Sequence, residues 1–348
     1  MLWMLVLVAV FFVFSLIVLR GENLAYLDQP LPAPEPSEPG PEQKAVLDLL
    51  NELSATPLGR GRQRIYKIRE LMDGIGAGQD YECEFRPVQA GQVRGEWVLA
   101  DGCDPDKRLL YIHGGAFFAG SPLSHRPITD RLARLTGAAV FSLDYRLAPE
   151  NSRMAGIEDT RAAYRWMLEH GPEGAGAADT VVIAGDSAGG SLTLGLIAWI
   201  RDEGLRQADA AIAFSPSTDS ALDAPSIRAN IPTDPMLGPA FAYLAKVPAI
   251  FLLWFTWLTA RILPSDPRIS PLRGELGNLP PVLVQASTTE MLLDDARRYV
   301  VKAQAAESPV VLQTWPNMVH VWQMFRDLPE AEDAFQNVLE FLDGATAR

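Results

Sequence analysis

Short apolar runs alternate with amphipathic stretches over most of this chain. Runs of about four to eight apolar residues that end in turn residues predict strands, and apolar positions that recur about every three to four residues predict helices. The predicted strands cover residues 82–88, 93–100, 109–112, 139–143, 181–184, 211–214, 282–285 and 310–314. The predicted helices cover residues 160–168, 191–201, 292–305 and 330–342, and two more helices are expected between residues 43 and 72.

This order of elements predicts the fold class. Strands that alternate with helices form mostly parallel sheets with helices on both faces. We therefore expect an α/β protein with a mostly parallel sheet of eight strands, which starts with an antiparallel pair because no helix separates the first two strands. A chain of 348 residues is long enough for one large domain and an additional element or two.

The N-terminal segment 1–19 contains no charged side chain. Its length is close to the ~20 residues that a helix needs to cross a bilayer. A cleaved signal peptide would normally show a basic start, a shorter apolar core and a small-residue cleavage site, and none of these is clear here. We therefore expect an uncleaved single-pass anchor. Arg20 and later cations follow the span, which favours a cytoplasmic catalytic domain.

A proline-rich segment follows the anchor. Between Pro30 and Pro41, proline alternates with Ala, Glu, Ser and Gly, a composition that favours extended polyproline geometry and cannot pack a core. Residues 20–42 are therefore predicted to be a linker between the membrane and the body. Residues 43–348 are predicted to form the folded domain.

One insertion interrupts the alternation of strands and helices between Phe214 and Val282. Its segment 250–258 is apolar on every face of a helix, so it is buried or it contacts lipid or substrate. Lys246 precedes the segment and Arg261 ends it, which leaves it short for a second span. Packing in the core or in a cap is favoured over lipid contact, because apolar helices of this length are more often buried.

Charge and cysteine content exclude several classes of function. A net charge of −13 and the absence of a Lys/Arg stripe argue against a nucleic acid partner. The two cysteines, Cys83 and Cys103, form no disulfide framework and match no metal-ligand spacing. They form either one bridge or two free thiols, and free thiols are favoured. No metal site is expected.

One serine lies at a predicted strand-to-helix turn. Ser187 stands in Gly185-Asp186-Ser187-Ala188-Gly189-Gly190, directly after the apolar run 181–184. The glycines permit a bend and a close helix–strand contact that a Cβ would obstruct. Such a turn lifts the Ser187 hydroxyl clear of the sheet and points the backbone N–H of Ala188 toward the oxygen of a bound acyl group. This is the pattern of a nucleophile elbow.

Acyl transfer through a serine also needs donors for the oxyanion. The segment Tyr111-Ile112-His113-Gly114-Gly115-Ala116-Phe117 follows a predicted strand upstream of the elbow. Consecutive glycines let backbone N–H groups approach a substrate oxygen closely. Gly114 and Gly115 are therefore the expected donors, together with Ala188, although a Gly-Gly pair after a strand is by itself more often a tight turn.

A general base must come from the four histidines. His320 lies in a loop directly after the last predicted strand, where catalytic groups often lie, and it alone fits the chain order of serine, acid and histidine. His113 belongs to the oxyanion loop, where we expect it to shape the backbone by hydrogen bonding. His125 and His170 stand in polar contexts and are expected to be surface residues.

The acid that orients the histidine should follow the strand at 282–285. Glu290 lies in the loop just past that strand and is the preferred candidate. Asp294 and Asp295 fall a helical turn further on, where capping or solvation of the next helix is the favoured role. Asp294 is the reserve candidate.

Taken together, these motifs resemble those of the hormone-sensitive-lipase group of α/β-hydrolase esterases, which includes bacterial carboxylesterases and membrane-anchored arylacetamide-deacetylase-like enzymes. The matching segments are 113–116, 144–150, the elbow at 185–190, Ser215-Pro216 with Asp219, 234–237, 290–295 and 318–322. The resemblance implies the α/β-hydrolase fold with a helical cap from about 43–80 and 215–275, hydrolysis of short to medium acyl esters, and no cofactor. It also implies that Asp144 and Glu150 are structural.

The chain departs from the group's pattern at a few positions. Ala116 stands where many members have a third glycine, and Ser287 replaces the usual glycine after the seventh strand. Neither change removes a catalytic group. The expected function is thus a serine carboxylic-ester hydrolase that acts on a small-molecule ester. The alternatives are an amide or N-acetyl hydrolase with the same residues, or a hydrolase-fold binding protein that does no chemistry. The oligomeric state is not predicted.

Overall fold

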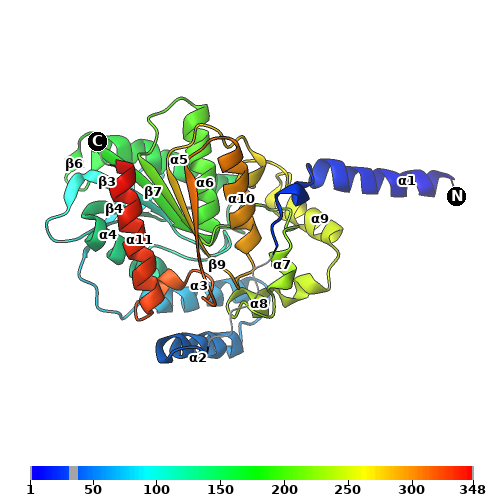
Figure 1. Cartoon of the computed structure of the whole chain (residues 1–348), viewed down its shortest axis with the longest axis horizontal. Coiled ribbons are helices and arrows are strands. Elements are labelled where there is room, and N and C mark those ends of the chain that lie inside the picture. The colour runs from blue at the N-terminus through cyan, green and yellow to red at the C-terminus, as the bar shows by residue number, and fades with distance from the viewer. Residues whose placement is uncertain (1, 31–37, 347–348) are drawn as a thin grey trace.

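The computed structural model describes residues 2–30 and 38–346, and an eight-stranded sheet runs through its centre (Figure 1). The strand order is β1-β2-β4-β3-β7-β8-β9-β10. The strands are β1 Glu84–Ala90, β2 Val93–Leu99, β3 Asp104–Ile112, β4 Ala138–Leu143, β7 Thr180–Asp186, β8 Ala210–Phe214, β9 Val282–Ser287 and β10 Val310–Trp315. Two short strands, β5 His170–Gly171 and β6 Gly174–Ala175, form a separate hairpin.

The direction of the strands agrees with the sequence prediction. β1 pairs antiparallel with β2, and β2 pairs antiparallel with β4. All other neighbours in the large sheet are parallel. Each predicted strand is found, although β3 begins earlier than expected, because Asp104 already pairs with Ala138 of β4 before a register shift between Asp104 and Arg108. The α/β class and the mixed eight-stranded sheet are therefore confirmed.

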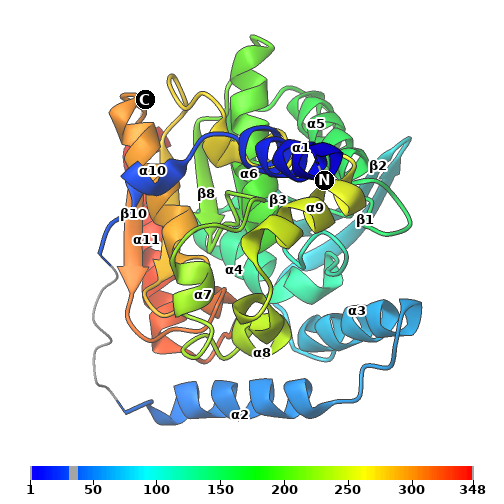
Figure 2. The ribbon, with the colours of Figure 1, turned by 90° about the vertical axis from the view of Figure 1, so that its right-hand side faces the viewer.

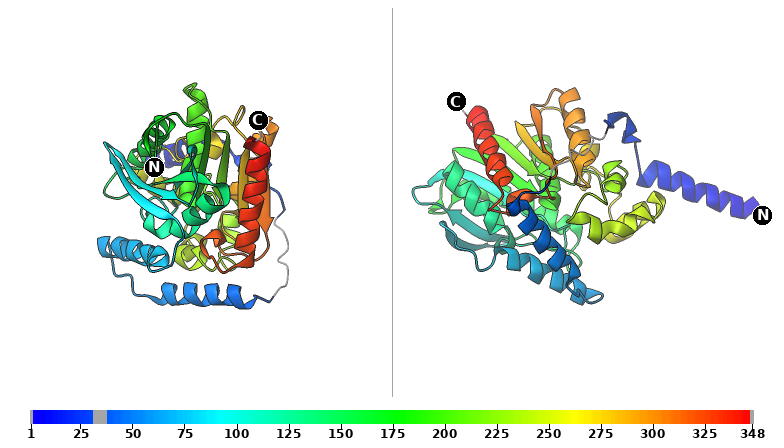
Figure 3. Two further views of the ribbon diagram at one scale, coloured as in Figure 1. Left: turned by 90° about the vertical axis from the view of Figure 1, so that its left-hand side faces the viewer. Right: turned by 60° about the horizontal axis from the view of Figure 1, so that its bottom comes forward.

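Helices cover both faces of the sheet, and each face has its own hydrophobic core. Successive side chains of a strand point to opposite faces, so Leu110 belongs to one core and Tyr111 to the other. The first core is completed by α5 and α6 and by α10, and the second by α4 and α11. These helices are α4 Arg126–Thr136, α5 Arg153–Glu169, α6 Ser187–Asp202, α10 Leu293–Ala305 and α11 Pro329–Thr346. Figure 3 shows these layers from two further sides.

Further helices lie outside these layers, and Figure 2 shows α2 below α8 and α3. They are α2 Pro41–Ala55 and α3 Arg62–Gly76 from the N-terminal part, and α7 Ser226–Ala229, α8 Leu237–Phe241, η4 Ala242–Ala245 and α9 Ala249–Ala260 from the insertion. The guanidinium of Arg69 in α3 donates hydrogen bonds to the carbonyls of Phe118 and Ala148 and forms an ion pair with Glu150 at 2.8 Å. This ties α3 to the body and gives Glu150 a structural contact.

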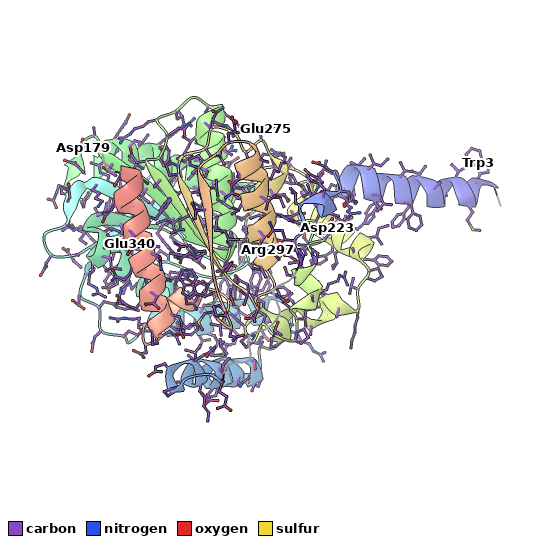
Figure 4. The ribbon with its side chains drawn as sticks, in the orientation of Figure 1. Trp3, Asp179, Asp223, Glu275, Arg297 and Glu340 are labelled. Carbon is purple, nitrogen blue, oxygen red and sulfur yellow. The ribbon has the colours of Figure 1, made fainter. Side chains whose placement is uncertain are left out.

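The N-terminal segment is one helical rod that projects from the body, with Trp3 at its far end (Figures 1 and 4). α1 Leu2–Val13 continues into a turn of π-helix, η1 Phe14–Leu19. Among the residues described, one stretch near the N-terminus, Ala9–Leu27, is long and apolar enough to cross a membrane, and only 22% of it is buried.

The beginning of the predicted linker is folded rather than extended. The short helix η2 Leu24–Leu27 packs against α10, and Leu24 and Leu27 are buried in the first core. Arg298 of α10 forms an ion pair with Asp28 at 2.6 Å. The linker prediction is therefore wrong for residues 20–30, because Leu24, Leu27 and Asp28 contact the body and the prolines begin only at Pro30. Residues 31–37, the centre of the proline-rich segment, lie outside the described residues.

The apolar helix of the insertion is only half buried. In α9, Leu252 and Leu253 point inward, whereas Phe251, Phe255 and Leu258 are 57%, 63% and 51% exposed. The preference for core or cap packing is thus right for one face of the helix and wrong for the other. The cysteines are free, as favoured, with Cys83 buried and Cys103 partly exposed.

Candidate active site

Ser187 lies at the end of β7, where the chain turns sharply into α6. Its φ of 51° is in the left-handed region that a non-glycine residue rarely adopts. The bend requires glycine on both sides. A Cβ on Gly185 would lie 2.6 Å from the carbonyl oxygens of Gly189 and Ile112, and one on Gly189 would collide with the Ile112 carbonyl. The strand-to-helix elbow expected from the sequence is therefore present.

Three predicted site residues meet at the carboxyl ends of the parallel strands. His320 follows β10, and its Nε2 lies 3.0 Å from the hydroxyl oxygen of Ser187. Glu290 follows β9, and its Oε2 lies 2.6 Å from Nδ1 of the same ring. Both His320 and Glu290 are buried, with 3% and 0% of their surface exposed. One continuous line of hydrogen bonds thus connects the carboxylate, the imidazole and the hydroxyl.

The environment of His320 favours the protonated ring. Burial alone would lower its pKa, but the hydrogen bond to Glu290 and the negative charge of that carboxylate outweigh burial and raise the pKa above its usual value. The second carboxylate oxygen of Glu290 accepts the backbone N–H of Ser287 at 2.8 Å. Both oxygens therefore accept a hydrogen bond, and the carboxylate is fixed in its orientation.

The other two acid candidates lie away from His320. Asp294 accepts the backbone N–H of Ser226 and pairs with Arg297 at 3.0 Å. Asp295 accepts the backbone N–H groups of Thr218 and Asp219. Both lie in the first turn of α10, as expected, but they are buried and not solvated. They attach the insertion to α10, which a pattern of charges along the chain could not reveal.

The glycine loop after β3 lies against the elbow. The N–H of Gly114 donates to Asp186 at 2.9 Å and lies 3.2 Å from Nε2 of His125, so it is already paired. Gly115 has a φ of 111°, and a Cβ there would collide with the Ala119 carbonyl. Within the described part of the chain, the N–H of Gly115 donates no hydrogen bond to another backbone group. The first N–H groups of α6, which include that of Ala188, have no acceptor within their own helix.

A buried network that sequence reasoning missed holds this loop. Asp186 accepts hydrogen bonds from Tyr111 at 2.7 Å and from Gly114, and its other oxygen lies 3.4 Å from Nε2 of His125. Burial works to raise the pKa of Asp186, but the charge of His125 and the hydrogen bonds from His125 and Tyr111 lower it overall. The sequence signal that could have revealed this network is the position of Asp186 directly before the nucleophile candidate, Ser187.

His125 is fully buried, so its expected surface position is wrong. The short helix η3 Leu123–His125 turns the ring inward beneath the glycine loop, where Nδ1 lies 2.8 Å from the Ser124 hydroxyl. His113 shapes the loop as expected, since its Nδ1 donates to the Gly114 carbonyl at 2.8 Å. Burial and the neighbouring His125 lower the pKa of His113 to about 3, which makes it a poor proton acceptor. His170 is partly exposed and stacks on Trp166, outside the site.

Neighbouring side chains hold the two loops that carry Glu290 and His320. The hydroxyl of Ser287, which replaces the glycine usual at this position, donates to the Met318 carbonyl at 2.7 Å and so connects these loops. Asn230 of the insertion donates to the Glu290 carbonyl at 2.9 Å, and Gln43 of α2 donates to the Asn317 carbonyl at 2.7 Å. The helices outside the sheet therefore contact both loops directly. No cluster of three or more His, Cys, Asp or Glu suited to a metal is found among the described residues.

Comparison with known proteins finds relatives with the same fold. A family model described as the alpha/beta hydrolase fold matches residues 109–324. An acetyl-hydrolase of Streptomyces hygroscopicus is 38% identical over 261 residues, which cover 74% of this chain and 82% of the relative. An esterase of Acinetobacter venetianus is 34% identical over 264 residues, which cover 76% and 83%.

The chain also resembles solved structures of esterases. A crystal structure of an esterase from the bacterial hormone-sensitive lipase family superimposes with a TM-score of 0.78 at 34% identity. The match covers 89% of this chain and 99% of that structure. The crystal structure of a mutant of the esterase E40 gives a TM-score of 0.77 at 34% identity, with the same coverage.

Proposed function

The chain belongs to the α/β-hydrolase fold family as a carboxylesterase-type hydrolase of the hormone-sensitive-lipase group, and we propose that it cleaves short to medium acyl esters through Ser187, His320 and Glu290. The observation that carries this proposal is the buried line of hydrogen bonds from Glu290 to His320 at 2.6 Å and from His320 to Ser187 at 3.0 Å. A nucleophile, its base and an orienting carboxylate in this order are the requirements of acyl transfer.

The reaction begins when the Ser187 hydroxyl oxygen attacks the ester carbonyl and forms the new C–O bond. Nε2 of His320 accepts the hydroxyl proton, and Glu290 holds the N–H at Nδ1 and stabilises the resulting imidazolium. His320 then returns the proton to the leaving alcohol as the original ester C–O bond breaks. A water molecule attacks the acyl-enzyme with His320 again as base, which releases the carboxylic acid and restores the Ser187 hydroxyl.

The negative charge that develops on the carbonyl oxygen needs donors fixed in advance. The N–H groups of Gly115 and Ala188 take this role in our proposal. Gly114, which the sequence also suggested as a donor, is paired with Asp186, so in the resting enzyme it fixes the loop. The network of Asp186, Tyr111 and His125 thus positions the donors and takes no proton from the substrate.

A second candidate reaction uses the same residues on an amide or an N-acetyl group. The acetyl-hydrolase among the relatives removes an acetyl group, by its name, and the leaving group is left open. A binding protein without chemistry is less favoured, because such a protein typically lacks the base, and His320 is present and hydrogen-bonded.

The test compares p-nitrophenyl esters of increasing acyl length with p-nitroacetanilide, for the wild type and for Ser187→Ala. We expect the wild type to hydrolyse the esters, with a maximum at short or medium acyl chains, and the variant to be inactive. Faster hydrolysis of the anilide would favour the amide reaction. No hydrolysis of either compound by the folded wild type would refute both candidates.

We also propose that α1 and η1 anchor the enzyme in a membrane, with the catalytic domain on the cytoplasmic side. A cleaved signal sequence would also be long and apolar. Cleavage would, however, remove the partner of α9, because Trp254 donates to the Ser15 hydroxyl at 2.8 Å. An uncleaved anchor remains with membranes after alkaline extraction and keeps its N-terminal peptide in mass spectra. A soluble product that starts after residue 19 would contradict it.

A further inference from the structure

The N-terminal rod is packed on the insertion and is not a loose tether. Phe11 stacks on Trp254 with ring centroids 5.3 Å apart and planes 9° apart. Phe14 contacts the rings of both Trp254 and Trp257. The Ser15 hydroxyl accepts the indole N–H of Trp254. Aromatic stacking and a hydrogen bond therefore hold the rod and α9 in one arrangement.

Ionic contacts fix the base of the rod to the catalytic body. Arg20 pairs with Asp223 at 2.8 Å, and Arg298 of α10 pairs with the other oxygen of Asp223 at 2.8 Å. Figure 4 labels Asp223 where the rod joins the body. Burial works to raise the pKa of Asp223, but the hydrogen bonds from Arg20 and Arg298 lower it overall, so the carboxylate stays charged. These ion pairs thus fix the orientation of the rod relative to the catalytic domain.

The outer face of α9 continues the apolar surface of the rod. Phe251, Phe255 and Leu258 stand at positions i, i+4 and i+7, which place them on one side of the helix, and all three are more than half exposed. In the rod, Leu7 and Ile17 are 68% and 67% exposed. Large apolar surfaces of this kind are rare on a protein that meets only water.

The opposite face of α9 packs near the loop that carries Glu290. Leu252 packs in a cluster with Met291 and Leu292, the two residues that follow Glu290 in the chain. The exposed stripe of α9, formed by Phe251, Phe255 and Leu258, and the loop that carries Glu290 therefore lie on opposite sides of the same helix.

We propose that α9 is an interfacial helix that contacts the lipid bilayer together with the anchor and fixes the catalytic domain against the membrane. The inference rests on the anchor proposed above. Lipid is favoured over a second copy of the chain, because the stripe lies beside the rod Leu2–Leu19, which carries no charged side chain and is close to the ~20 residues that a bilayer span needs. Lys246 precedes α9 and Arg261 ends it, and both are exposed. Cations avoid the centre of a bilayer but suit anionic headgroups, so α9 lies at the interface and does not span.

The test measures lipid and water access at single positions of the full chain in vesicles of phosphatidylcholine and phosphatidylglycerol. A nitroxide is attached to Leu7→Cys, Phe255→Cys or Val311→Cys in a Cys103→Ser background, since Cys83 is buried. Val311 is the matched control, because it is a 46% exposed apolar residue on β10. Collision with lipid-soluble oxygen is compared with collision with a water-soluble nickel chelate. Phe251→Cys repeats the measurement on α9 in case Phe255→Cys does not fold.

We expect oxygen to dominate at Leu7, Phe255 and Phe251, and the nickel chelate to dominate at Val311. Water access at Phe255 and Phe251 with lipid access at Leu7 would overturn the inference and leave the anchor intact. Access to neither reagent at the α9 positions would mean that a second protein copy covers the stripe, which would also overturn it. Water access at Leu7 would refute the anchor itself, whereas the esterase proposal is judged separately by hydrolysis of water-soluble esters.

Discussion

Replacement of Glu290 by glutamine probes the acid with almost no change of shape. Both carboxylate oxygens act as acceptors, one for Nδ1–H of His320 at 2.6 Å and one for the N–H of Ser287 at 2.8 Å. An amide has a single acceptor oxygen. If that oxygen stays on Ser287, the amide NH2 faces the ring and selects the tautomer with the proton on Nε2. That tautomer cannot accept the proton of Ser187.

The size of the effect follows from the lost charge. Two unit charges about 4 Å apart at an effective dielectric constant near 20 attract each other by ~4 kcal/mol. At ~1.36 kcal/mol for each factor of ten in rate, this predicts a loss of about 10³ in kcat. The corresponding Asp-to-Asn substitution in a Ser-His-Asp protease costs about 10⁴ in kcat, because it also selects the wrong tautomer. KM should change little, because Glu290 is buried behind the ring and stabilises charge that forms only in the transition state.

The assay is the pH dependence of p-nitrophenyl ester hydrolysis. The base must be neutral, so kcat/KM falls as the pH falls through the pKa of His320, which lies above the ordinary value of ~6.5. Removal of the negative charge should move this midpoint downward in Glu290→Gln, because the carboxylate no longer stabilises the protonated ring. Asp294→Asn is the matched control, because Asp294 contacts Ser226 and Arg297 and not His320. A mild effect of Glu290→Gln with a severe effect of Asp294→Asn would show that Glu290 is not the orienting acid.

Three further substitutions test other parts of the site and the fold. In Gly114→Ala the new Cβ collides with the Asp186 carboxylate, so we expect kcat to fall by about 10²–10³. The control Gly195→Ala on α6 meets no atom within 4 Å and should keep full activity. Equal activities of the two variants in a kinetic assay would contradict this. Ser287→Gly removes the hydrogen bond to the His320 loop, which should cost ~1 kcal/mol of stability in chemical denaturation and lower kcat more than it changes KM. Burial and the charge of nearby Asp219 raise the pKa of Asp295 to about 8. Because the folded state then holds this proton more tightly than the unfolded state, folding stability should fall as the pH rises from near 4 to about 8. Asp295→Asn should flatten that fall in thermal melts, and an unchanged dependence of stability on pH would exclude Asp295 as its source.

The sheet and the arrangement of Ser187, Glu290 and His320 could be predicted because both depend on local rules. Strands that alternate with helices indicate a mostly parallel sheet, and the carboxyl ends of parallel strands meet at one edge of the sheet. A serine, an acid and a histidine that each follow a different strand therefore come together even though residues 187 and 320 are far apart in the chain.

The parts that were missed depend on tertiary contacts. Polar neighbours suggested that His125 lies at the surface, but a short helix turns its ring into the buried network around Asp186. Residues 20–29 are predicted to be linker because they precede the proline-rich segment, but Leu24 and Leu27 pack against α10. For α9, composition alone could not say which face is covered, because its partner is η1, more than two hundred residues away in the chain.

Ser187 is the sole nucleophile in the proposed ester hydrolysis, and every other role in the site depends on it. The most direct measurement is the intact mass of the protein after reaction with a fluorophosphonate, followed by peptide mapping. We predict one adduct per chain on the peptide that contains Ser187, loss of ester hydrolysis in proportion to labelling, and neither labelling nor hydrolysis in Ser187→Ala. An adduct on another residue such as Ser191, or ester hydrolysis that persists in Ser187→Ala, would contradict this assignment.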